Sequence, residues 1–291
     1  MSTTGTGTAQ DPFIVDTWAD FITAVGTADA YVEVDTSQIS VWDFPREVPS
    51  GLSSTVTWSA ASVDGKGLTI KGLFGSATRW FSGTTSGTKI ISNLNLLDMS
   101  KTSATTGVLY GRAYECRNCD FSGIIEGGYF FESYSGGTII FTTGILGNND
   151  PKGCSFSLKF SGDSRFSSGT SASVSPKIYH GTLNLDGTST SSTAQHFNLN
   201  DSKIIGGMPW NSLTLQTNSG GQNVIDADIE NISTYTNSSG TVCLINTDKL
   251  ASGLSVPSGF TGVTSAQMLN AAYLESVGFH VEEEEEQQGG E

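Results

Sequence analysis

The sequence has little charge, few basic residues and no long apolar run. Charged residues make up 15% of the 291 positions, and 29 acidic side chains stand against 14 basic ones, for a formal net charge of −15. A nucleic-acid-binding protein needs clustered Lys and Arg to neutralise phosphates, so this composition argues against that class. No run of 18 apolar residues occurs, so we expect no membrane-spanning helix. The first ten residues have neither a basic nor an apolar segment, so we expect no secretory signal peptide.

Cysteine is also scarce. Without a predicted export signal, Cys116, Cys119, Cys154 and Cys243 are expected to be reduced thiols. The Cys116-Arg-Asn-Cys119 spacing is compatible with a redox pair or with half of a zinc site. It lies inside a predicted strand, Tyr114–Phe121, in which residues three apart point to opposite faces. We therefore expect one of these two cysteines to be buried and the other to point outward.

Small residues that are polar or lack a side chain are abundant: 40 Ser, 34 Thr and 35 Gly. The 36% of hydrophobic residues still suffices for a core. Short alternating runs recur along the chain, for example Lys89–Leu97, Lys177–Leu185 and Asn223–Ile232. Successive runs of this kind begin about 16 to 25 residues apart, which indicates a solenoid. A β-sandwich would show shorter spacings and paired hairpin turns such as Asn-Gly, and no Asn-Gly pair occurs in the sequence. We predict an all-β fold, a right-handed parallel β-helix.

The two ends differ from the middle. Residues 1–30 are expected to form a flexible leader and a capping helix, begun by Thr17 and ended by Gly26, with an apolar stripe at positions 18, 21, 22 and 25. The β-helix should span residues 31–260. Residues 261–281 are predicted to form a helical cap with Leu269, Ala272 and Tyr273 on one face, which either covers the end of the rod or docks on its side. Residues 282–291 form an acidic tail.

The opening segment carries a family resemblance. Gly5-Thr-Gly-Thr-Ala-Gln-Asp-Pro-Phe-Ile-Val15, followed by Trp18-Ala-Asp-Phe-Ile22, resembles the start of many pectate-lyase-like right-handed parallel β-helix proteins. Leu274–Phe279 is similar to endings in the same group. These proteins occur among bacterial surface and phage proteins, so the resemblance implies a β-helical rod of the kind found in phage fibres, spikes and capsid decorations, commonly trimeric.

One run of carboxylates is a candidate chemical site. Asp226, Asp228 and Glu230 alternate with apolar residues, so in a strand all three face the same side. Such a row could bind calcium through oxygen ligands, act as an acid/base pair, or simply form a solvated outer face. The nearest basic residues, Lys203 and Lys249, would have to come from neighbouring coils. We assign no catalytic residue, no cofactor and no definite metal site.

Two groups of aromatic residues need an explanation. Those of the first quarter of the chain either fill the first coils beneath the cap or form a sugar-stacking platform; they are Trp42, Phe44, Trp58, Phe74, Trp80 and Phe81. Tyr129, Phe130, Phe131 and Tyr134 lie between paired glycines. They are predicted to form a loop that leaves the rod and contacts a neighbouring subunit, with a buried strand as the alternative.

The leading hypothesis is a non-enzymatic structural component of a bacteriophage virion: a head fibre, a capsid decoration, or a tail spike or fibre. Its location would be the virion, and its partners would be copies of itself in a trimer, other virion proteins and host-surface glycans, without nucleic acid or membrane. We expect neither an export signal nor a separate catalytic or wall-anchoring domain, and this expectation favours the hypothesis. The alternatives are a polysaccharide lyase or hydrolase of the same fold and a bacterial surface adhesin.

Overall fold

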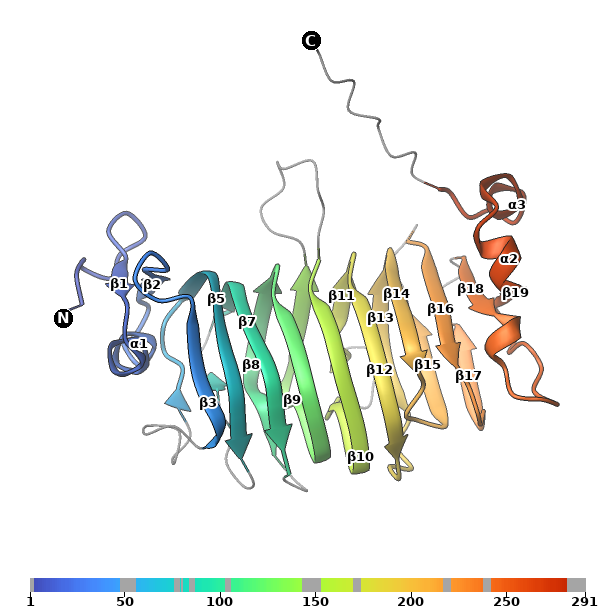
Figure 1. The fold of residues 1–291 in the computed structure, drawn as a ribbon, viewed down its shortest axis with the longest axis horizontal. Coiled ribbons are helices and arrows are strands. Elements are labelled where there is room, and N and C mark those ends of the chain that lie inside the picture. The colour runs from blue at the N-terminus through green and yellow to red at the C-terminus, as the bar shows by residue number, and fades with distance from the viewer. Residues whose placement is uncertain are drawn as a thin grey trace, which may run out of the picture.

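The computed structural model describes residues 3–47, 56–75, 79, 81–83, 87–102, 106–142, 153–169, 174–216, 221–237 and 242–281, without the side chains of residues 45–47, 56, 113 and 134–137. These residues form a rod with helices at its two ends (Figure 1). The elements are β1 (Phe13–Val15), α1 (Trp18–Val25), β2 (Tyr31–Val34), β3 (Val41–Glu47), β4 (Val56–Thr57), β5 (Ser62–Gly75), β6 (Phe81–Gly83), β7 (Lys89–Lys101), β8 (Gly107–Arg117), β9 (Asp120–Thr142), β10 (Ser155–Ser167), β11 (Lys177–Tyr179), β12 (Thr182–Ser189), β13 (Gln195–Asn200), β14 (Ser202–Gly207), β15 (Ser212–Gln216), β16 (Asn223–Asp228), β17 (Thr234–Asn237), β18 (Cys243–Asn246), η2 (Thr247–Lys249), β19 (Thr261–Val263), α2 (Ser265–Met268) and α3 (Ala271–Ser276).

The strands belong to one 19-stranded sheet whose ladders between named strands are parallel. One stack runs β2–β5–β7–β9–β10–β12–β14–β16–β18–β19, and a second runs β4–β6–β8–β9–β11–β13–β15–β17. Each coil adds one strand, or one part of a long bent strand, to each stack. The predicted right-handed parallel β-helix is therefore confirmed.

The core consists of columns of side chains stacked from coil to coil. One buried column is in register from the first coils to the last: Trp42, Ile70, Leu96, Phe121, Phe156, Leu183, Ile204, Ile225 and Ile245. Its members are 28 residues apart at the start, from Trp42 to Ile70, and 20 apart at the end, from Ile225 to Ile245. Because the coils differ in length, the sequence period is irregular even though the stacking is regular.

One corner of the coil is made by single residues in the left-handed conformation. Asn93, Asn118, His180 and Asp201 have φ between 49° and 51°. The Asn118 amide donates to Asn93 Oδ1 on the preceding coil at 2.8 Å, so these corner side chains are also linked from coil to coil. Asn and Asp tolerate this conformation better than most residues do. The polar residues that separate the predicted strands thus have a specific structural role.

This corner overturns the expectation for the Cys116–Cys119 pair. The chain turns at Asn118, so β8 ends before Cys119 and β9 begins after it. Both thiols are fully buried, and Cys154 of the next coil joins them, with its Sγ 3.4 Å from Cys116 O and 3.5 Å from Cys119 N. Burial raises the pKa of the Cys116 and Cys154 thiols, so these side chains are protonated core residues.

Helix α1 closes the N-terminal end as the sequence predicts. Thr17 caps it by accepting from Asp20 N, and Phe21 and Val25 are buried in the core. The Phe21 ring lies 5.2 Å from Trp42 and 6.3 Å from Trp58 between centroids, and both indoles are buried. Trp42, Trp58 and Phe81 therefore fill the first coils, with Phe44 packed against them. Phe74 is half-buried, and Trp80 lies outside the described residues.

The C-terminal segment differs from the prediction in two ways. It forms two short helices rather than one, with Leu269 at the break and 91% exposed, while Leu274 is the residue that becomes buried. Leu274 packs with Leu244 and Val263 in a cluster separate from the main core. Since Cys243 and Ile245 point inward, Leu244 points outward, so the helices dock on the side of the last coils.

The end of the main core is covered by a different segment. Leu254, Val256 and Phe260, which follow η2 and precede β19, are half-buried against the main core cluster. Docking of the helices on the side is further supported by the Gln222 side chain, which hydrogen-bonds the backbone N–H and C=O of His280 from the start of β16. The loop and the helices thus cover different surfaces.

Of the two structures that the sequence left open for Tyr129–Tyr134, the buried strand and not the protruding loop is found for the central residues. Phe130 and Phe131 lie within β9 and are fully buried. Gly127 and Gly128, with φ of 83° and 71°, turn the chain at a corner, after which it continues along the coil. The Phe130 ring packs 5.1 Å from that of Phe121, so it belongs to the core. The Tyr129 hydroxyl accepts from Arg165 at 2.6 Å, and the Tyr134 side chain lies outside the described residues.

Candidate functional site

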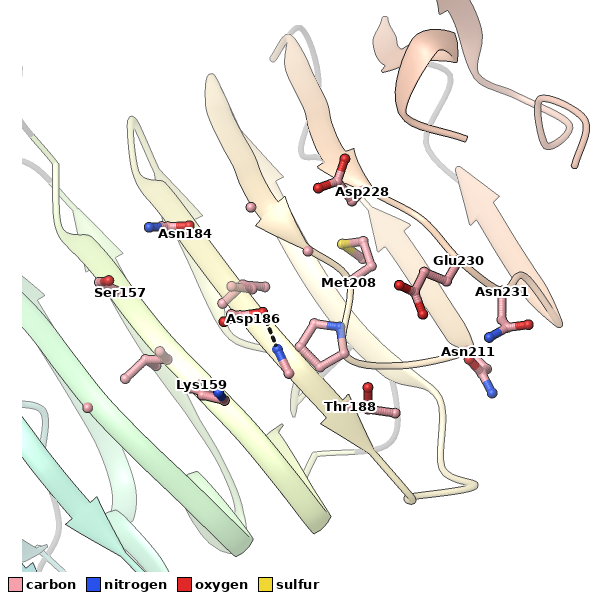
Figure 2. A pocket seen from close by; sticks show the side chains of 17 residues that line it. Ser157, Lys159, Asn184, Asp186, Thr188, Met208, Asn211, Asp228, Glu230 and Asn231 are labelled. Carbon is pink, nitrogen blue, oxygen red and sulfur yellow. Dashed lines mark hydrogen bonds between the residues drawn. The ribbon is translucent and has the colours of Figure 1, made fainter. Parts of the chain in front are cut away.

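A groove crosses the outer face of one strand stack and encloses a volume of about 580 Å³ (Figure 2). Five strands contribute to it: β9 through Gly123, then β10, β12, β14 and β16. The labelled side chains around it are Ser157, Lys159, Asn184, Asp186, Thr188, Met208, Asn211, Asp228, Glu230 and Asn231. The groove is therefore assembled from segments more than 100 residues apart, which only the stacking of the coils brings together.

The groove is hollow because one glycine, Gly207, leaves a gap in an outward row of side chains. Lys159 pairs with Asp186 across β10 and β12, and Gly207 pairs with Asp228 across β14 and β16. A Cβ placed on Gly207 would lie 3.6 Å from Leu185 O, so the position has room for a side chain that it lacks. Gly206 is different, since its φ is +81° and an added Cβ would lie 2.4 Å from Leu185 O. Gly206 is needed for the backbone, and Gly207 leaves the space open.

The lining is polar and carries charges that are not paired. Asn184, Asn211 and Asn231 supply amides, and serine and threonine supply hydroxyls. The charged members, Lys159 and the carboxylates of Asp186, Asp228 and Glu230, are exposed and, among the described residues, none of them takes part in an ion pair. Asp186 Oδ1 accepts from Gly187 N at 2.7 Å, which fixes its orientation at the bend of β12.

Asp226, the first of the three predicted carboxylates, has a structural role beside the groove. Its carboxylate lies 3.0 Å from Lys249 Nζ and 3.4 Å from Lys203 Nζ, and it accepts from the Asn246 amide at 2.8 Å. Burial alone would raise the pKa of Asp226, but the Asn246 hydrogen bond and the two ammonium groups together lower it. Neighbouring coils thus supply the basic partners that are distant in the sequence.

The alternation predicted for Asp226, Asp228 and Glu230 is present, since the residues between them are buried and the three acids face outward. They do not act as one group, because Asp226 is held by lysines whereas Asp228 and Glu230 line the groove. In the described ranges, no three His, Cys, Asp or Glu side chains are arranged so that they could hold a metal ion.

Sequence reasoning missed Lys159, Asn184 and Asp186. The Asp186-Gly187 pair is a visible turn signal, but nothing in the sequence shows that it stacks beside Lys159 or near Asp228. That proximity depends on coil register, and a shift by one residue would exchange inward and outward faces. The glycine pair at 206 and 207 was the signal most open to interpretation, because consecutive glycines in a strand mark missing side chains.

A second charged cluster joins Arg79, which precedes β6, to residues of β7, β8 and β9. The Arg79 guanidinium donates to both Glu132 carboxylate oxygens at 2.6 and 2.8 Å, and Gly107 N donates to Glu132 Oε2 at 3.0 Å. Lys101 is fully buried nearby, and its Nζ donates to Thr106 Oγ1 at 2.9 Å. Burial, only partly opposed by Glu132, lowers the pKa of Lys101 to about 8. The donors and acceptors are satisfied within the protein, which favours a structural role.

Fold and groove together define a class: a right-handed parallel β-helix rod with a polar lateral groove. No protein family matches the chain, and no significant match is found among curated proteins or solved structures. In the described part of the chain, no helix is long and apolar enough to cross a membrane.

Proposed function

We propose that this chain is a non-enzymatic structural component of a bacteriophage virion, a fibre, spike or decoration, which projects from the particle and binds host-surface glycans in the groove. Two features support the proposal. The opening segment, Gly5–Val15 with Trp18–Ile22, resembles that of pectate-lyase-like β-helix proteins known from phages and bacterial surfaces. The rod also presents an open polar groove on its side.

The groove is the observation that carries the glycan-binding part. Its lining combines amides, hydroxyls and carboxylates, which provide both donors and acceptors for sugar hydroxyls. Five strands at roughly 4.8 Å spacing span about 19 Å along the rod. This length suits several linked sugar units better than one. We therefore expect affinity to increase with oligosaccharide length until the groove is filled.

Filling the empty position at Gly207 tests this directly. The Gly207→Trp side chain should occupy the hollow between Asp186 and Asp228 without disturbing the backbone. On a glycan array we expect the wild type to bind and Gly207→Trp to lose at least about tenfold in affinity. The matched control is Thr236→Trp, because Thr236 is exposed on β17 in the other stack. Equal binding by wild type and Gly207→Trp, with both folded by circular dichroism, would contradict the assignment.

A second candidate, a polysaccharide lyase or hydrolase, is favoured by one observation: Asp228 and Glu230 both line the groove. Two carboxylates flanking a bound sugar can serve as acid and base. Incubation of the wild type with the oligosaccharides that it binds, followed by mass spectrometry, separates the two functions. We expect intact ligand; cleavage that disappears in Asp228→Asn or Glu230→Gln would establish the enzyme instead.

A further inference from the structure

We propose that the groove discriminates between glycans by charge: it accepts uncharged or amine-bearing oligosaccharides and rejects those that carry carboxylate, sulfate or phosphate groups. This inference rests on the proposed glycan-binding function and concerns the same site. It follows from how the charges around the groove are arranged.

The groove has an uncompensated negative charge. Asp186, Asp228 and Glu230 contribute three carboxylates, and Lys159 is the one cation among the described lining residues. None of them is neutralised by an ion pair within the described residues. Asp226, on the same outer face but outside the lining, is held by two lysines. The two surroundings differ sharply: beside the groove an acid is compensated, and inside it the acids are free to contact a ligand.

The cation lies at one side of the groove. Lys159 is on β10 and pairs in register with Asp186 on β12, whereas Asp228 and Glu230 lie beyond the Gly207 hollow. A ligand that spans several coils therefore passes at least two carboxylates that have no basic neighbour in the lining. If each sugar unit carried an acidic group, one such group would lie next to one of these two carboxylates. Two neighbouring negative charges repel each other.

Hydrogen bonding favours the same ligands. An ionised carboxylate only accepts hydrogen bonds, so the groove needs donors from its ligand. Sugar hydroxyls supply such donors without charge, and a sugar ammonium supplies three together with a favourable charge. An acidic sugar replaces a donor by another acceptor. The amides at Asn184, Asn211 and Asn231 can adapt to either polarity, so the carboxylates decide the selectivity.

The test is a matched set of oligosaccharides on one backbone. Chitin oligosaccharides are neutral, their de-N-acetylated forms carry amines, and cello-oligosaccharides oxidised at C6 carry carboxylates; a glycan array extends each charge class to other backbones. Binding is measured at 0.15 M salt, where the Debye length is about 8 Å and the charge of the rest of the protein is largely screened. We expect neutral and amine-bearing ligands to bind and acidic ones to bind at least about tenfold more weakly.

Charge-removing variants give the second readout. The triple variant Asp186→Asn, Asp228→Asn, Glu230→Gln should gain affinity for acidic ligands about tenfold and lose the preference for amines. Lys159→Gln, the matched control, should not gain. If acidic glycans bind the wild type tightly and this binding is lost in Gly207→Trp, the proposed charge selection is overturned. Glycan binding in the groove would still stand. If no glycan of any class binds, the proposed function itself fails.

Discussion

At the scale of single residues, the neighbouring glycines 206 and 207 have different roles. Gly206 adopts a backbone conformation that disfavours other residues, and Gly207 leaves space in the groove. Gly206 has φ of +81°, and an added Cβ would lie 2.4 Å from both Asn184 Oδ1 and Leu185 O. Gly207 would place its Cβ in ordinary contact, at 3.6 Å or more. The first glycine is required by the fold, and the second is required only if the groove must stay empty.

Alanine at these two positions should therefore differ in its effect on the free energy of unfolding. Gly206→Ala is expected to lower the free energy of unfolding by about 1–3 kcal/mol, because a side chain in this conformation is strained. Gly207→Ala should change the free energy of unfolding by less than about 0.5 kcal/mol, because the added Cβ makes only ordinary contacts. Urea denaturation of both variants checks this; equal losses would show that position 207 is structurally constrained as well.

Burial of Lys101 lowers the stability of the rod at neutral pH. Its ammonium is fully buried, and burial lowers its pKa from 10.5 to about 8. The folded protein therefore binds fewer protons than the unfolded chain between about pH 8 and 10.5. By linkage, the contribution of this group to the free energy of unfolding rises with pH across that window.

Comparison with Lys101→Met isolates this effect from other titrating groups. We expect the free energy of unfolding of the wild type, relative to Lys101→Met, to be lower at pH 7.5 than at pH 10. Urea denaturation of both proteins at both pH values measures the difference. A difference that stays constant with pH would mean that Lys101 is not desolvated in the folded state.

At the scale of elements, the long bent strand β9 decides between the two structures that the sequence left open for Phe130 and Phe131. Phe130 is packed against the rings of Phe121, Phe141 and Phe166 at 5.1 to 6.1 Å between centroids. Phe130→Ala should therefore lower the free energy of unfolding by about 3–5 kcal/mol, as expected for a phenyl group removed from a core. Thermal or urea denaturation measures the loss, and a loss below about 1 kcal/mol would instead fit an exposed loop, the other structure that the sequence left open.

The sequence predicted those elements whose pattern is local. The strand at Asn223–Asp228 followed from alternation, and helix α1 followed from Thr17 and its apolar stripe. Prediction failed where a corner reorients the chain: Asn118 changes direction between two cysteines, and Gly127–Gly128 return the following residues to the core. The groove could not be predicted at all, because it depends on which residues of successive coils lie in register.

At the scale of the whole molecule, the chain has a formal net charge of −15, and the rod carries a polar groove on its side. The resemblance to phage fibres and spikes leads us to propose a trimer, consistent with the general preference for closed symmetric assemblies. Light scattering on the full-length chain should give about three times 30.6 kDa. A monomer at all concentrations would contradict self-assembly in solution and would restrict assembly to the particle.

The most direct test of the central claim is a crystal structure of the protein soaked with the oligosaccharide that binds best on the array. We predict density along the groove across β10, β12, β14 and β16, with sugar hydroxyls in contact with Asp186 and Asp228. Density at another surface, or an empty groove in crystals of a protein that binds the same ligand in solution, would contradict it.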